Sequence, residues 1–281
     1  MKKIKLVDNT EITFEELALS DSNGIPHVMT LLQEKRLNPE DVPEELLSLK
    51  NNSSISVLNV CIERLKEPVP DNDGQIVPRA LFLANKHGCG LPLHFRKVKE
   101  ILRIARENGW SVAHEMASQN LLPESMMTEE ILSLTNDTGY AVAYAAAWHD
   151  SLPGWAKRRK DILLLGNGQG DYVVHELARN GKLPVEMMTP DILHLENKNG
   201  ITVFSAIVFG KHLSPEILML PWNKKIRIFK YLSSAEFLNQ NLSQQTIKYV
   251  KEQLAVFEAL MWKKSFSTLS VIGHDHEDLE R

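Results

Sequence analysis

The stretch GDYVVHELARNGKLP, residues 170–184, decides the fold, because the chain repeats it. Matching stretches read GWSVAHEMASQNLLP at 109–123, GYAVAYAAAWHDSLP at 139–153 and GITVFSAIVFGKHLS at 200–214. Their leading glycines are separated by 30, 31 and 30 residues, and apolar residues recur at matched positions. Self-similarity at a fixed period of this length is typical of repeat architectures. The sequence therefore predicts an array of similar units over residues 109–220.

Fainter copies precede this block. They begin near Gly24 and Ser54, which are again 30 residues apart. Residues 66–108 do not follow the period, and we expect an insertion there, with a helix from about Leu93 to Glu107 suggested by apolar residues at helical spacing. The repeats at both ends of this insertion are expected to belong to one protein architecture.

After residue 220 the repeat register is lost, and the sequence favours two further helices, near 225–238 and 244–262, which would cap the array. The expected organisation is then a series of five segments: weak repeats at 1–65, the insertion at 66–108, repeats at 109–220, a helical cap at 221–265 and a flexible tail at 266–281.

Each repeat can be interpreted as two helices. A glycine beside Asn, Asp or Gly supplies a turn with positive φ, and Ser111 or Thr202 then caps the first helix. Gly181 is placed to end a first helix, and Thr189-Pro190-Asp191 to begin a second one. Helices this short are marginal alone in water, so they must stack on their neighbours. The predicted fold class is all-α, an α-solenoid of helix-turn-helix repeats with a helical C-terminal cap.

The stretch at 170–183 also resembles the ankyrin repeat, whose pattern is G-x-T-P-L-H-x-A-A-x-x-G-H-L. Both glycines, the histidine, the alanine and the final leucine fall in register. The period is about 30 rather than about 33 residues, and valine replaces the proline, so the array is described as a divergent, ankyrin-like one. The resemblance implies that His114 and His175 are structural side chains that tie one turn to the next.

Composition narrows the function. The net charge is -4 and the pI is about 6.2, which argues against a general nucleic-acid binder. The basic run Lys157–Lys160, beside Trp155, leaves RNA binding as a weaker alternative. No apolar run approaches the length of a membrane span. Only two cysteines occur and the N-terminus does not resemble a signal peptide, so we expect a cytoplasmic protein.

No arrangement of residues predicts a catalytic centre, a metal site or a cofactor site. The alternative to a binding protein is a hydrolase or transferase with a thiol nucleophile in the insertion, for which Cys89, His87 and His94 are the least implausible residues. The glycines at 166, 168 and 170 are interpreted as part of a repeat turn, because their spacing differs from that of a dinucleotide-binding loop.

The positions that vary within the repeat are the candidate binding residues. Directly after the turn glycines come Trp110, Tyr140, Asp171 and Ile201. Large exposed aromatic residues are typical of binding hot spots, so these residues are expected to contact a partner, together with Trp148, Trp155 and Arg158. The equal alternative is that the rings of Trp110 and Tyr140 pack between adjacent turns.

The predicted function is therefore that of a non-enzymatic module that binds another protein through its repeat tips and concave face. The habits of ankyrin-bearing proteins extend this expectation to a bacterial or phage protein that acts on a host component. The identity of the partner and the oligomeric state are left open by the sequence.

Overall fold

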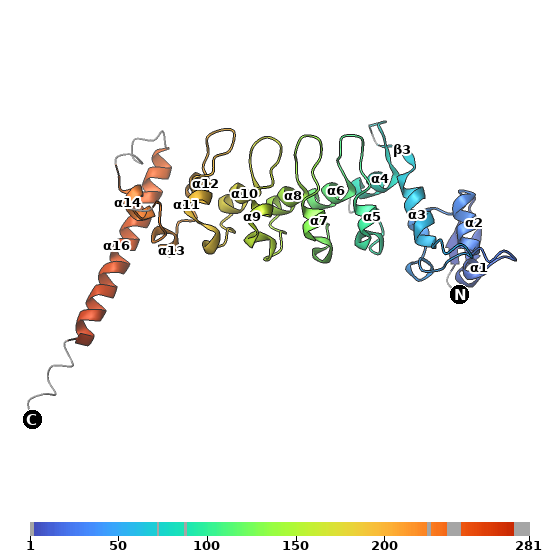
Figure 1. The fold of residues 1–281 in the computed structure, drawn as a ribbon, viewed down its shortest axis with the longest axis horizontal. Coiled ribbons are helices and arrows are strands. Elements are labelled where there is room, and N and C mark those ends of the chain that lie inside the picture. Colours follow the sequence, from blue (N-terminus) through green and yellow to red (C-terminus); the bar gives the residue numbers. More distant parts are fainter. Residues whose placement is uncertain (1–2, 72, 87–88, 224–225, 235–242, 273–281) are drawn as a thin grey trace, which may run out of the picture. The chain divides into compact units, whose positions relative to one another are not determined.

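The structure is a computed structural model that describes residues 3–71, 73–86, 89–223, 226–234 and 243–272, with side chains up to residue 261. The chain divides into two compact units, Met1–Pro153 (unit 1) and Gly154–Arg281 (unit 2), each described by itself. Both are mostly helical and contain repeated pairs of short helices (Figure 1).

In unit 1 the elements follow one another as β1 (Lys3–Lys5), β2 (Glu11–Thr13), α1 (Phe14–Ala18), α2 (His27–Gln33), the 3₁₀ helices η1 (Pro39–Asp41) and η2 (Glu44–Leu46), α3 (Val57–Lys66), β3 (Pro68–Pro70), β4 (Ile76–Pro78), α4 (Arg79–Asn85), η3 (Phe95–Lys97), α5 (Lys99–Leu102), α6 (Val112–Ser118), η4 (Glu124–Met126), α7 (Glu129–Leu132) and α8 (Val142–Trp148).

In unit 2 the order is η5 (Ala156–Arg158), α9 (Lys160–Leu163), α10 (Val173–Arg179), η6 (Val185–Met187), α11 (Pro190–Leu193), α12 (Val203–Phe209), α13 (Pro215–Leu218), α14 (Ile228–Leu232) and α16 (Gln244–Ile272).

The expectation of an all-α fold holds for the helices but omitted short antiparallel hairpins. Strand β1 pairs with β2 in the register Lys3↔Thr13, and β3 pairs with β4 in the register Pro68↔Pro78. Strands of three residues carry too little pattern to be recognised from alternation of apolar and polar residues.

Each copy of the repeat begins with a turn closed by a backbone bridge between residues six apart, as in Ala105↔Ser111, Thr135↔Ala141, Gly166↔Tyr172 and Glu196↔Thr202. Inside the turn before α8, the Asn136 side chain accepts hydrogen bonds from the amides of Thr138 and Tyr140. Gly109 has φ 78°, and a Cβ there would lie 3.0 Å from the Cα of Asn136 in the next turn, so glycine is required. Within each unit, these turns lie along one edge (Figure 1).

The turn leads directly into the first helix of the copy. The Ser111 hydroxyl accepts from the amide of His114 at the start of α6, and Thr202 accepts from Ser205 at the start of α12, as predicted. Gly181 has φ 67° just beyond α10, which confirms its role as a C-terminal cap. Thr189 precedes Pro190 at the start of α11, but its hydroxyl bonds to the Asp191 side chain instead of a backbone amide.

Successive first helices contact one another. In unit 1 the contacts run α2 to α3, α3 to α4, α4 to α6 and α6 to α8, and in unit 2 α10 contacts α12. The residues between them are fully buried, for example Val112 and Met116 on α6. Helices of seven residues cannot be stable alone in water, so this mutual burial is what holds them.

Two hydrogen bonds orient each side of a first helix. The Gln119 side chain of α6 donates to the carbonyl of Ala84 in α4, the preceding first helix, at 3.1 Å. His114, on another side of α6, bonds to the carbonyl of Tyr140 in the following turn. Residues 112, 115, 116 and 119 share a helical face, so this face of α6 is directed at the preceding copy.

The segment 66–108, expected to be an insertion, contains the local elements of a repeat. Its hairpin bridges Pro70 and Ile76, six residues apart like the other turns, and leads into α4. The helix expected from Leu93 to Glu107 was wrong. Val98 is extended (φ -107°, ψ 113°) and separates η3 from the four-residue helix α5, so the buried Ile101 and Leu102 belong to one helical turn.

The C-terminal region begins with one more turn of the same kind, bridged between Pro221 and Arg227, and the helix α14 that follows is much shorter than the expected span 225–238. Helix α16 confirms the second expected helix and runs on to Ile272, past the expected start of the tail; residues 273–281 lie outside the described part. The ring of Trp222 stacks on Tyr231 with centroids 4.0 Å apart and closes this part of unit 2.

Candidate partner-binding surface

A buried histidine ties two turns together in unit 1. The Nδ1 atom of His114 accepts from the Ser111 amide at 3.2 Å and lies 2.7 Å from the Ser111 hydroxyl. Since Nδ1 accepts, Nε2 carries the proton and donates to the carbonyl of Tyr140 at 3.0 Å. Burial lowers the pKa of His114, which keeps the ring neutral.

His175 does the same in unit 2. Its Nε2 atom lies 3.1 Å from the carbonyl oxygens of both Leu195 and Ile201, and its Nδ1 accepts from the Tyr172 amide. Burial lowers the pKa of His175 as well. Both rings are completely covered, and their bonds run to the next turn, so they are built as cross-links between copies and present no free nitrogen to a substrate.

The rings of Trp110 and Tyr140 meet each other. Their centroids are 5.5 Å apart, and Trp110 also lies 5.1 Å from the ring of His114. The indole nitrogen of Trp110 donates to Glu115 at 2.9 Å. Both aromatic side chains are half-buried. The rings therefore do pack between adjacent turns, as the alternative expectation held, and each leaves only part of its surface to solvent.

Helix α8 extends this aromatic cluster. Tyr140, Tyr144 and Trp148 follow at intervals of four residues, which places them along one side of the helix. The ring of Tyr144 is buried and lies 5.5 Å from that of Tyr140, whereas Trp148 in the last turn of α8 is 58% exposed. Of the three, Trp148 offers the most surface to a partner.

Unit 2 has a polar group of residues in the matching positions. Asp171 accepts from the Asn197 amide at 2.6 Å, and its carboxylate lies 3.9 Å from Arg179. Arg179 also pairs with Glu176, which is almost completely buried and accepts from Asn180 at 2.9 Å. Ile201 is half-buried. The predicted residues Asp171 and Ile201 thus lie around the His175 cross-link, in a network that leaves Asp171 partly open to solvent.

Trp155 and Arg158 stand at the start of η5. Trp155 is 43% exposed. Arg158 donates to Glu186 at 2.8 Å and to the carbonyl of Gly154 at 3.0 Å. These contacts hold the guanidinium on the surface of unit 2, next to an exposed indole, which is a combination that is enriched in binding hot spots.

The basic run at 157–160 is largely paired with carboxylates. Besides Arg158 with Glu186, Arg159 pairs with Asp161 and Lys160 pairs with Asp191 at 2.8 Å. The hydrogen bonds of Lys160 and Thr189 lower the pKa of Asp191 to about 2. In unit 1 the matching pair of copies has Lys99 and Arg103 on Glu130. Basic second helices therefore face acidic ones in both units, which weakens the case for a phosphate-binding site.

The residues proposed for a thiol enzyme are not arranged as one. Cys89 is buried in a loop with φ 56°, and its carbonyl accepts from the Arg96 guanidinium at 2.8 Å. Burial lowers the pKa of His94, whose Nε2 atom has no hydrogen-bond partner among the described residues. His87 lies outside the described part of the chain. Cys61, the other thiol, is buried, which raises its pKa to about 12.

A search of the described residues for groups of three or more His, Cys, Asp or Glu side chains able to hold a metal ion finds none. Within the same residues, the helices are too short or too polar to cross a bilayer.

Phe209 is a candidate that the sequence interpretation missed. It ends α12, 49% exposed, at the repeat position that Trp148 occupies at the end of α8. Ser118 and Arg179 hold this position in the other copies. A comparison of the copies column by column would have found it, because the position changes from serine to tryptophan, arginine and phenylalanine while its neighbours remain apolar.

Comparison with known proteins adds no assignment. No family model matches the chain, and a search of curated proteins gives no significant match.

Proposed function

We propose that the chain is an ankyrin-like α-solenoid that binds another protein and catalyses no reaction. The support for a solenoid is the recurrence of one turn, one first helix and one short second helix, each with its apolar residues covered by a neighbouring copy. A structure of this kind offers an extended surface on which positions can vary without disturbing the core.

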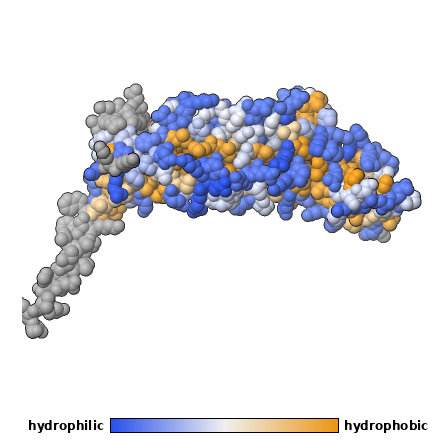
Figure 2. Space-filling model, in the orientation of Figure 1, coloured by the Kyte–Doolittle hydropathy of each residue, from blue (hydrophilic) through white to orange (hydrophobic). Residues whose placement is uncertain are grey.

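The observation that carries the proposal is the exposure of Trp148. A tryptophan side chain that is 58% exposed stands on a helix whose other residues are buried alanines, valine and tyrosine. Hydrophobic surface lies between hydrophilic margins on the face that Figure 2 shows. Aromatic anchors beside polar rims are typical of protein interfaces, so the partner is proposed to cover Trp148 and the exposed edges of Trp110 and Tyr140.

In unit 2 the proposed contacts are Phe209, Trp155 and Arg158, with Asp171 and Ile201 at the turns. Both cysteines are free, which fits a reducing compartment such as the cytoplasm. A bacterial or phage protein acting on a host component remains the proposed setting, on the strength of the ankyrin-like resemblance alone.

The test replaces Trp148 by a photo-crosslinking phenylalanine analogue, with the same analogue at Leu93, which is 69% exposed, as the matched control. The partner that crosslinks at 148 and not at 93 is then purified, and its affinity is measured for the wild type, Trp148→Ala and Leu93→Ala. We expect Trp148→Ala to weaken binding by about thirtyfold, the effect of a typical hot spot. Unchanged affinity in Trp148→Ala would refute the proposed surface, and turnover of a substrate that Cys89→Ser abolishes would favour the enzyme.

A further inference from the structure

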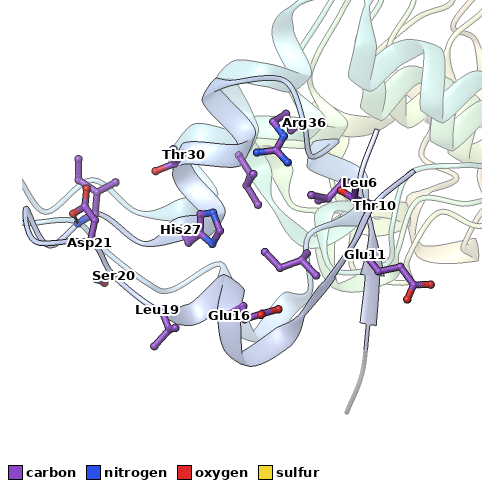
Figure 3. A pocket seen from close by; sticks show the side chains of 13 residues that line it. Leu6, Thr10, Glu11, Glu16, Leu19, Ser20, Asp21, His27, Thr30 and Arg36 are labelled. Carbon is purple, nitrogen blue, oxygen red and sulfur yellow. Dashed lines mark hydrogen bonds between the residues drawn. The ribbon is translucent and has the colours of Figure 1, made fainter. Parts of the chain in front are cut away.

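A hollow of about 610 Å³ lies beside α2 in unit 1 (Figure 3). Its apolar lining includes Leu19, which is 65% exposed, and the half-buried Ile25. His27 and Thr30 line it from α2, and Glu16 lines it from α1. None of these residues belongs to the surface proposed above, so the hollow needs its own explanation.

The repeat register shows which side of α2 the hollow occupies. The bridge Ser20↔Pro26 corresponds to Ala105↔Ser111, so His27, Thr30 and Leu31 of α2 match Val112, Glu115 and Met116 of α6. On α6 this is the face directed at the preceding copy, as the bond from Gln119 to Ala84 shows. The hollow therefore lies on the side of α2 where a later copy receives a preceding first helix.

In the later copies a helix fills this place. Helix α4 packs against α6, and Val112 and Met116 are fully buried in that contact region. Beside α2, the described chain instead has the β1–β2 hairpin, from which Leu6 and Ile12 reach the hollow. The hairpin leaves Leu19 and His27 exposed, although the residues that match them on the next copies, Ile104 and Val112, are buried.

The rim of the hollow is acidic. Among the described residues, neither Glu16 nor Asp21 is part of a salt bridge, and hydrogen bonds from Thr13 lower the pKa of Glu16, so it stays ionised. The one arginine of the rim, Arg36, is neutralised by Asp8 at 3.2 Å. Among the polar residues that line the hollow, His27 and Thr30 have side chains without a hydrogen-bond partner in the described chain and can bond to an occupant.

We propose that this hollow is a docking site for a short amphipathic helix of a partner protein. The helix takes the place that a preceding first helix takes in the later copies, buries its apolar side on Leu19, Ile25 and Leu31, and directs a basic residue at Glu16 and Asp21. This site is distinct from the surface around Trp148, and the two can be tested separately.

A suitable probe is the sequence PRALFLANK, residues 78–86, because α4 fills the matching place against α6 and carries Arg79 and Lys86. The peptide is labelled with fluorescein and stapled as a helix on the side away from Ala80, Leu81 and Ala84. Its binding to the full chain is measured by fluorescence anisotropy. We expect saturable binding, which Leu19→Arg weakens at least about tenfold by repelling the basic helix, while Leu93→Arg, the same change at an equally exposed leucine, leaves it unchanged.

Three results would overturn the proposal. The first is a lack of saturable binding of the stapled peptide. The second is equal binding of an unstapled peptide with proline in place of Leu81, since a helix is then not required. The third is self-association of the chain without peptide that Leu19→Arg abolishes, measured by sedimentation velocity, since a second copy would then be the occupant.

Discussion

The copy that begins at Gly109 and the one that begins at Gly170 share a frame and differ on their surface. Each buries a neutral histidine that donates to the carbonyl of the following turn. Around His114 the neighbours are aromatic, with Trp110 and Tyr140, whereas around His175 they are polar, with Asp171 and Arg179. The comparison teaches that the cross-link carries the architecture, while the residues beside it are free to define different contacts in the two units.

The largest effect is expected from removing the shared cross-link. His175→Ala leaves the carbonyls of Leu195 and Ile201 without their buried donor and creates a cavity, so we expect a loss of about 3 kcal/mol in the free energy of unfolding. Urea unfolding followed by circular dichroism measures it. His149→Ala is the control, because His149 is exposed and should change stability by less than about 0.5 kcal/mol. Equal losses in the two variants would show that the histidine is not a cross-link.

A smaller effect is expected on the aromatic side of the comparison. Trp110→Ala removes a half-buried ring from His114 and Tyr140 and a hydrogen bond to Glu115, and we expect a loss of about 2 kcal/mol. Trp148→Ala, which removes an exposed ring, should leave stability within about 0.5 kcal/mol of the wild type. If Trp110→Ala unfolded as the wild type does but bound the partner more weakly, Trp110 would be a contact residue and not a packing one.

The smallest effect is a pH dependence that both copies share. The pKa values of His114 and His175 lie below the ordinary 6.5, so at lower pH the unfolded chain takes up protons that the folded chain does not. Stability is complete above pH 6.5 and falls as the pH drops below it toward the lowered pKa values, by up to about 1.4 kcal/mol per unit for each histidine.

Unfolding between pH 7.5 and 5.5 tests this prediction. The double variant His114→Gln, His175→Gln should be less stable at pH 7.5 but lose less stability on acidification than the wild type. His94, whose pKa is also lowered by burial, keeps part of the slope. A slope that is the same in the double variant would show that these two rings do not resist protonation.

The regular copies could be predicted from the sequence because their local signals are strong. The glycine at positive φ, the capping Ser or Thr and the histidine of the turn all act within a few residues, and they fix where the first helices begin. The cross-linking role of His114 and His175 followed from the ankyrin-like resemblance, and their geometry agrees with it.

The segment 66–108 escaped the search because its spacing is irregular. Helix α3 leads directly into β3 without an intervening second helix, so the bridged turns at Lys50 and Pro70 are only 20 residues apart, and the next turn follows at Ala105, 35 residues later. A search at one fixed period passes over both. The hollow beside α2 was also beyond sequence reasoning, because it depends on what covers a helix in three dimensions.

The alternation of basic and acidic second helices limits how such a chain can lengthen. Lys99 and Arg103 meet Glu130, and Arg158 and Lys160 meet Glu186 and Asp191. Duplication or deletion of a single copy would bring like charges side by side, whereas a gain or loss of two copies preserves every attraction. Growth by even numbers is thus electrostatically permitted at each step, and the pairing of neighbours acts as a parity rule on the history and the engineering of the array.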